Sequence, residues 1–238
     1  EQILIRSSNI GAVRIAQKIG VEKYKKFLNS LELLNKINFD LEEVGTPLSF
    51  KWGKCKLATT SYGHGITTTP LQLIKAYAIL GNGGYRIKPY ILQKEKKNFK
   101  KKDQIISNKT SKEINLMLRK VVSLNEGTAN FANIDGYDVG GKTGTAVKYN
   151  SKEKLNTFVS LFPSSRPKYA LLVMLDEPKP APKYIYQFPA SDKFPNGYKY
   201  KGENRNTSGW NTVVVAGKII EKIGPILAIN ELHTSKNF

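Results

Sequence analysis

Residues 137–175 read YDVGGKTGTAVKYNSKEKLNTFVSLFPSSRPKYALLVML, and their pattern differs from that of the flanking sequence. Three runs of β-type sequence, 137–146, 157–162 and 169–175, are separated by polar turns. This pattern predicts three consecutive antiparallel strands. The third run is apolar at successive positions, which predicts a strand at the centre of a sheet, buried under helices.

The sequence on both sides of this stretch has the periodicity of helices. A polar cluster, Ser7-Ser8-Asn9, caps a predicted helix over 10–19, and Thr69-Pro70 starts another over 71–80. The remaining predictions are helices over 21–34, 111–124 (capped by Thr110 or Ser111) and 209–223, an irregular stretch over 35–68, a short strand over 90–93 and a surface loop over 177–208. Helices, a β-meander and a covering helix together describe an α+β domain with an antiparallel sheet covered by helices.

Composition excludes several classes of protein. The chain has 238 residues with 40% apolar side chains, which is too many for a disordered chain, and it has no apolar run long enough to span a membrane. The single cysteine, Cys55, excludes an internal disulfide. The chain has only two histidines, His64 and His233, so we expect no metal or other cofactor. The net charge is +19, but the lysines are scattered without a nucleic-acid-binding motif, so we expect no nucleic-acid partner.

Two short motifs carry the candidate chemistry. Ser7-Ser8-Asn9 has a Ser-x-Asn pattern at a helix start, and Lys142-Thr143-Gly144 lies on the first strand of the meander. Each triplet alone occurs by chance in many chains. Together, in this order and on these elements, they match two of the three motifs of the penicillin-recognising serine enzymes.

At this point the chain resembles a class B penicillin-binding protein, the peptidoglycan D,D-transpeptidases, and most closely the cell-division (septal) kind. The segments that carry the resemblance are 5–11, 61–73, 141–146, 176–178 and 209–225. They extend over nearly the whole chain. The resemblance implies a penicillin-binding/β-lactamase-like transpeptidase fold, with residues 1–238 forming the C-terminal part of that domain.

The resemblance also implies an activity, a place and partners. The activity is the cross-linking of peptidoglycan stem peptides through a serine acyl-enzyme, which β-lactams inhibit, in septal cell-wall synthesis. The expected place is the bacterial inner membrane, with the catalytic domain on the periplasmic side. The chain starts at Glu1 without a leader, so we expect a membrane anchor upstream of it. A glycosyltransferase and other division proteins are the expected partners.

The same resemblance assigns roles to six residues. Ser7 would relay a proton, Asn9 would bind the acyl carbonyl of the substrate, and the charge of Lys142 would help keep a neighbouring lysine base neutral. These three are the expected catalytic residues. Thr143 and Thr145 would bind the terminal carboxylate, the Thr145 N–H would be an oxyanion donor, and Gly144 would let the substrate backbone approach.

One departure from the family pattern concerns the nucleophile. The family uses the serine of a Ser-x-x-Lys motif at the start of a buried helix, upstream of Ser-x-Asn. The two literal matches, Ser151 to Lys154 and Ser165 to Lys168, lie after the Lys-Thr-Gly strand in polar turns, and we interpret both as accidental. The nucleophile helix and the first strands of the sheet are therefore expected upstream of Glu1, which would leave this chain inactive alone.

Two alternative functions remain open from the sequence. A D,D-carboxypeptidase or β-lactamase-like hydrolase would use water as the acceptor on the same fold. A non-catalytic β-lactam-sensing module would keep the fold and lack the chemistry. His64 and Cys55 are interpreted as structural or surface residues, because neither has a partner motif.

Overall fold

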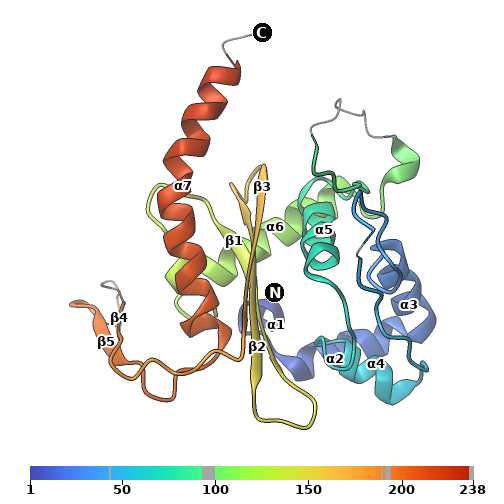
Figure 1. The fold of residues 1–238 in the computed structure, drawn as a ribbon, viewed down its shortest axis with the longest axis horizontal. Coiled ribbons are helices and arrows are strands. Elements are labelled where there is room, and N and C mark those ends of the chain that lie inside the picture. The colour runs from blue at the N-terminus through green and yellow to red at the C-terminus, as the bar shows by residue number, and fades with distance from the viewer. Residues whose placement is uncertain (43, 93–99, 189, 191–193, 236–238) are drawn as a thin grey trace.

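The computed structural model describes residues 1–42, 44–92, 100–188, 190 and 194–235, with the side chains of 231–235 left out (Figure 1). Helices precede the main sheet and one long helix follows it. The helices are α1 (Gln2–Ile5), α2 (Asn9–Ile19), α3 (Val21–Ser30), α4 (Lys54–Thr60), α5 (Pro70–Gly81), α6 (Asn108–Ser123) and α7 (Thr212–Ser235). The strands are β1 (Gly140–Val147), β2 (Lys154–Phe162), β3 (Tyr169–Asp176), β4 (Ile185–Phe188) and β5 (Tyr198–Lys201). Short 3-10 turns are η1 (Lys101–Asp103), η2 (Asn130–Ala132) and η3 (Ser208–Trp210).

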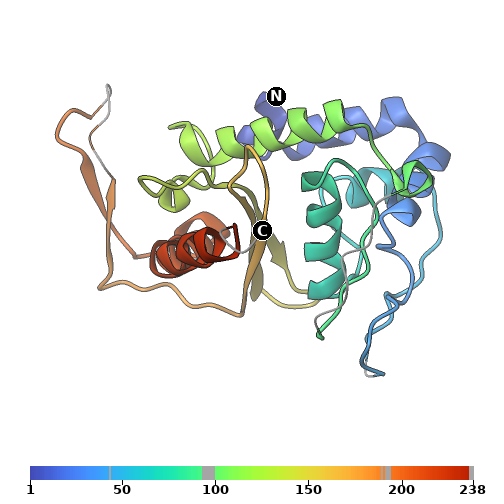
Figure 2. The same cartoon turned by 90° about the horizontal axis from the view of Figure 1, so that it is seen from above.

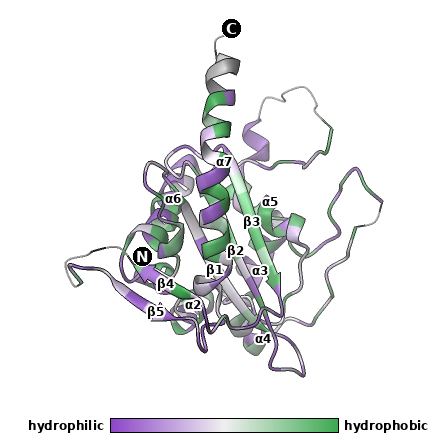
Figure 3. Cartoon of the chain, turned by 60° about the vertical axis from the view of Figure 1, so that its left-hand side comes forward, coloured by the Kyte–Doolittle hydropathy of each residue, from purple (hydrophilic) through white to green (hydrophobic). Residues whose placement is uncertain are grey.

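The main sheet has three antiparallel strands in the order β1-β2-β3. This arrangement confirms the α+β prediction with an antiparallel meander. The position of β3 differs from the sequence prediction, because β2 lies in the middle and β3 pairs only with β2 among the described residues. Figure 1 shows the reason for its apolar sequence: the sheet is seen edge-on between α7 and α5, and both helices contact β3. Figure 3 shows hydrophobic residues along this strand.

The main core joins α1 and α6 to the sheet and to α7. Its fully buried side chains include Ile5, Val121, Phe158, Val213 and Ile220. Helix α6 contacts both α1 and β1, and Figure 2 shows it running beside the N-terminal helices. Because Ile5 is anchored in this core, the start of α2 is held against the first strand of the sheet.

Local signals set the helix starts. The α5 start has a complete capping box, in which the Thr69 hydroxyl accepts from the Gln72 N–H and the Gln72 side chain accepts from the Thr69 N–H. Helix α6 begins earlier than predicted, with Ser107 as its N-cap instead of Thr110 or Ser111. The Ser107 hydroxyl accepts from the Thr110 N–H, which explains the earlier start.

Several other elements differ from the sequence predictions. Helix α4 forms inside the stretch predicted to be irregular, and α3 ends at Ser30 instead of continuing to residue 34. Residues 90–92 form no strand, because residue 90 is irregular and residues 91 and 92 form a bend, while residue 93 lies outside the described residues. Helix α7 continues to Ser235 with Pro225 inside it. Among the described residues, no helix combines the length and the apolar character needed to cross a membrane.

The predicted surface loop over 177–208 contains the two-stranded sheet β4-β5. We call the described residues 184–188, 190 and 194–201 the aromatic hairpin. Its rings pack on one another and on the rest of the protein: Phe188 stacks on Tyr198 with centroids 4.4 Å apart, and Phe131 lies 4.4 Å from Phe188. The Tyr186 hydroxyl also bonds the Trp210 carbonyl. These ring contacts explain why ordered strands form in a segment rich in proline.

Candidate functional site

The two sequence motifs meet at one hydrogen bond. The Lys142 ammonium, on β1, donates to the Ser7 hydroxyl over 2.7 Å, although the residues are 135 positions apart. It also donates to the Thr143 carbonyl at 2.9 Å. The structure therefore brings Ser7 and Lys142 together, and Asn9 lines the same groove as both.

The backbone before α2 explains why Ser7 is available for this contact. Ser8 is the residue that caps α2, because its hydroxyl accepts from the Gly11 N–H at 3.2 Å. Ser7 precedes the cap with φ of 54°, in the left-handed region that non-glycine residues rarely occupy. The Ser7 side chain is thus left free of capping and is directed to Lys142.

Burial changes the acidity of Lys142. Its pKa falls from the ordinary 10.5 to about 8, because the half-buried side chain is partly removed from water on β1. At pH 7 a group with that pKa is neutral in about one molecule in ten, against fewer than about one in a thousand for an ordinary lysine. Lys142 can therefore act both as a cation and, less often, as a proton acceptor.

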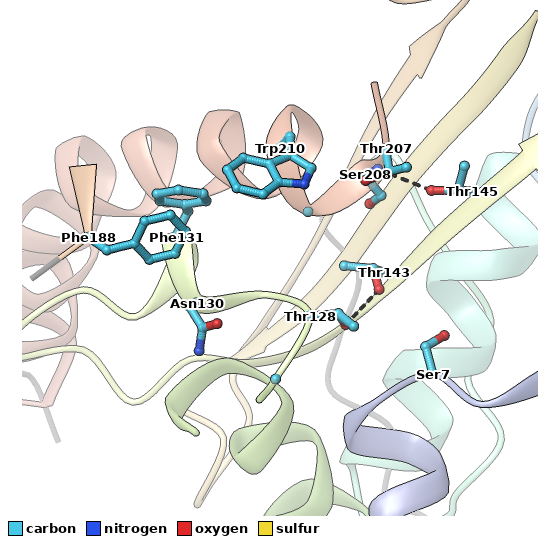
Figure 4. A pocket seen from close by; sticks show the side chains of 12 residues that line it. Ser7, Thr128, Asn130, Phe131, Thr143, Thr145, Phe188, Thr207, Ser208 and Trp210 are labelled. Carbon is cyan, nitrogen blue, oxygen red and sulfur yellow. Dashed lines mark hydrogen bonds between the residues drawn. The ribbon is translucent and has the colours of Figure 1, made fainter. Parts of the chain in front are cut away.

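The threonine hydroxyls of the motif face a pocket of about 360 Å³, which we call the threonine pocket. Figure 4 shows two hydrogen bonds there: the Thr143 and Thr128 hydroxyls are 2.8 Å apart, and the Ser208 N–H donates to the Thr145 hydroxyl at 3.1 Å. Each motif threonine is therefore held by a residue from a different loop.

Thr128 and Ser208 were not predicted from the sequence. Ser208 is almost fully buried; its hydroxyl bonds the Thr157 carbonyl and lies 2.7 Å from the Thr212 hydroxyl. Neither residue belongs to a recognisable motif, and each reaches the site only through tertiary folding. The only sequence signal for Ser208 is its place just before the covering helix.

A second cavity, of about 630 Å³, lies on the other side of β1, and we call it the lysine groove. Lys142, Gly144 and Asn9 line this groove, whereas Ser7 and Thr143 line both cavities. The alternation of side chains along a strand explains the division between the two faces. The Ser7–Lys142 pair thus lies where the two cavities join.

Gly144 also has a reason within the fold to lack a side chain. A Cβ atom there would lie 2.5 Å from the Thr157 hydroxyl oxygen on β2, closer than real Cβ contacts. Substitution at this position would push Thr157 and bend β1 as well as narrow the groove.

The accidental Ser-x-x-Lys matches lie elsewhere. Ser151 is in the turn between β1 and β2, and Ser165 is in the turn between β2 and β3, where its N–H donates to Asp138. Neither lines the threonine pocket or the lysine groove. His64 stands beside Tyr62 after α4, and Cys55 is exposed on α4. In the part of the chain that the structure describes, no three His, Cys, Asp or Glu side chains gather as metal ligands would.

Known proteins are similar to this chain in sequence and in fold. A family model described as the penicillin-binding protein transpeptidase domain matches residues 1–193. The probable peptidoglycan D,D-transpeptidase FtsI of Caulobacter vibrioides is 30% identical over 99% of this chain and 40% of its own length. The stage V sporulation protein D of Bacillus subtilis is 35% identical over 75% of this chain and 30% of its own length.

A solved structure is similar over most of the chain. The apo structure of the TP domain of penicillin-binding protein 3 from Burkholderia pseudomallei superposes with a TM-score of 0.70 and 25% identity. It covers 94% of this chain, which covers 63% of that domain. The chain thus has the penicillin-binding/β-lactamase-like fold that the sequence predicted, and it spans less than half the length of the curated relatives described above. Because the family model covers more than half of it, the chain belongs to the penicillin-binding protein transpeptidase domain family.

Proposed function

We propose that residues 1–238 are the C-terminal part of the transpeptidase domain of a peptidoglycan D,D-transpeptidase. The Caulobacter vibrioides relative carries that activity in its name, and the family model matches this chain. The observation that carries the proposal is the 2.7 Å hydrogen bond between the Lys142 ammonium and the Ser7 hydroxyl. It joins a Ser-x-Asn helix start to a Lys-Thr-Gly strand at the junction of two cavities.

The reaction is acyl transfer through a serine ester. The nucleophilic serine and its lysine base are contributed by residues upstream of Glu1. The serine oxygen attacks the carbonyl of the penultimate D-alanine and the terminal D-alanine leaves as an amine. The amine of a second stem peptide then attacks the ester and regenerates the serine. Water in place of this amine would make the enzyme a carboxypeptidase.

Residues of this chain serve the proton transfers and the binding of the substrate. Ser7 relays the proton to the leaving amine, and its contact with Lys142, whose pKa is about 8, gives that proton a nearby exchange partner. Asn9 binds the acyl arm through its carboxamide. The Thr143 and Thr145 hydroxyls, with the Lys142 charge, bind the terminal carboxylate, and the Thr145 N–H donates to the oxyanion.

The resemblance to septal penicillin-binding proteins suggests where the reaction takes place. The enzyme acts in cell-wall synthesis at division, outside the cytoplasm and attached to the inner membrane by an anchor upstream of this chain. β-Lactams acylate the same serine. A glycosyltransferase and other division proteins are its partners.

Labelling of the full-length protein with a fluorescent penicillin, followed by mass spectrometry of the labelled peptide, tests the proposal. We expect label on a serine upstream of Glu1. Lys142→Ala removes one pre-organised electrostatic contact and should slow labelling by about 10²- to 10³-fold. Ser151→Ala and Ser165→Ala are matched controls and should label normally. Label on Ser151, on Ser165 or on the 238-residue chain alone would contradict the proposed site.

A further inference from the structure

A third cavity lies beside the threonine pocket, between the aromatic hairpin and residues 123–133, and we call it the hairpin pocket. Its volume is about 630 Å³, within the range of small-molecule sites. Asn130, Phe131 and Phe188 line both this pocket and the threonine pocket. Figure 2 shows the hairpin projecting beyond α7, and Figure 4 shows Phe131 and Phe188 at the end of the threonine pocket away from Ser7. The hairpin pocket therefore continues the proposed active-site cleft outward.

One wall of the hairpin pocket is a series of aromatic rings. Phe194 lies 4.5 Å from Tyr198, which stacks on Phe188, which in turn packs on Phe131. The wall is not fully covered by protein, since Phe194 is 38% and Tyr200 is 40% exposed. Exposed rings at the edge of a packed series offer an apolar contact surface to a ligand.

Several of the other side chains that line the hairpin pocket are carboxamides. Asn125 and Gln187 are exposed, and their side chains make no hydrogen bond to any described residue. Asn133 faces the same cavity and accepts from Arg119 at 2.9 Å. A carboxamide both donates and accepts hydrogen bonds, so these groups match hydroxyl and acetamido groups.

Charge narrows the class of ligand. No lysine or arginine is among the described residues that line the hairpin pocket, although the chain carries a net charge of +19. Glu126 is the one charged residue in that described lining. Within the described lining an anionic ligand would meet no cation, and a purely apolar ligand would leave the carboxamides without hydrogen-bond partners. The lining fits a neutral ligand with apolar faces and polar edges.

We propose that the hairpin pocket binds the sugar part of the peptidoglycan strand. An N-acetylated pyranose presents C–H faces that pack on the aromatic rings and hydroxyl and acetamido groups that bond the carboxamides. The inference rests on the proposed function, because it places the glycan of the stem peptide that occupies the adjoining cleft. A stem of about four residues spans at most about 14 Å, so a sugar joined to it stays close to the threonine pocket.

Binding of chitotetraose, a peptide-free tetramer of N-acetylglucosamine, to the full-length protein tests this site. Isothermal titration calorimetry should detect binding to the wild type. The double variant Asn125→Ala/Gln187→Ala and the variant Phe194→Ala should each bind about tenfold more weakly or worse. Asn125 and Gln187 are exposed, so the double variant should keep the wild-type melting temperature, whereas Phe194 packs on Tyr198 and its variant is compared at a temperature well below its own melting point. Matched controls are Asn29→Ala on α3 and Tyr149→Ala, whose side chain is 90% exposed in the β1–β2 turn.

Each possible result of the binding experiment either supports or overturns the proposed sugar site. Loss of affinity in the pocket variants with normal binding in the controls supports the site. Absence of binding by the wild type, equal binding by all variants, or equal loss in the controls overturns it. Chitotetraose has no acyl group, so its binding is independent of the acylation chemistry. Failed penicillin labelling with pocket-dependent sugar binding would refute the proposed function alone, and the reverse result would refute the sugar site alone.

Discussion

Replacing Lys142 by methionine should stabilise the fold while it slows penicillin labelling. The substitution keeps an unbranched side chain of similar length and removes the buried charge. Burial lowers the pKa of Lys142 to about 8, whereas in the unfolded chain it has its ordinary value of 10.5. The folded state therefore binds the proton less well than the unfolded state, and the charged lysine disfavours folding.

The size and sign of the effect follow from this difference in pKa. Between pH 8 and 10.5 the unfolded chain binds more protons, so stability rises with pH in this window. Below pH 8 the charge costs its full amount, about 3 kcal/mol for a difference of 2.5 pKa units. We therefore expect Lys142→Met to be more stable than the wild type by about 3 kcal/mol at pH 7 and by about 1 kcal/mol at pH 10.

Urea unfolding of the full-length wild type and variant at pH 7 and pH 10 measures the two differences. Tyrosines titrate in both proteins, so their effect cancels in the comparison. Lys152→Met, at an exposed lysine in the β1–β2 turn, is the matched control and should change stability by less than about 0.5 kcal/mol at either pH. A Lys142→Met variant that is no more stable at pH 7, or whose advantage is the same at pH 10, would refute the reasoning.

Three further predictions concern the same region. Thr128→Val removes the hydroxyl that lies 2.8 Å from the Thr143 hydroxyl, and penicillin labelling of the full-length protein should slow about tenfold with little change in the urea midpoint; an unchanged rate would exclude a positioning role. Ser7→Gly and Ser7→Ala should both lose labelling, but the glycine variant should be more stable in urea by about 1 kcal/mol because it accepts φ of 54°, and equal stability would argue against strain there. The 238-residue chain alone should self-associate through the outer edge of β3, and a monodisperse monomer with a cooperative melt in size-exclusion and calorimetric measurements would contradict this.

The parts of the fold that the sequence predicted are those with local causes. The α2 and α5 helices have an apolar stripe and a cap within a few residues of the start, so the pattern alone locates them. The meander likewise appears as three β-type runs with short turns. The sequence did not predict that β3 is an edge strand. An apolar pattern indicates that both faces of the strand are covered by helices, but it does not indicate how many strands pair with it.

Elements that depend on distant contacts could not be predicted. The aromatic hairpin is held by ring contacts with Phe131, which lies well before it in the chain, and with Trp210, which follows it. The prolines in the same stretch of sequence suggest a loop instead. The same limit applies to the candidate site. Ser7 and Lys142 belong to recognisable motifs, whereas the hydroxyl and N–H that hold Thr143 and Thr145 come from residues with no motif.

The Ser7–Lys142 hydrogen bond has a consequence for how the sequence changes over generations. At position 7 the backbone favours glycine, and at position 142 the partial loss of water disfavours a charged side chain. If selection for the reaction were lost, substitutions that stabilise the fold would therefore be expected to accumulate early at both positions. A related gene that encodes glycine at position 7 and methionine or leucine at position 142 would therefore be expected to encode a protein that no longer catalyses the reaction.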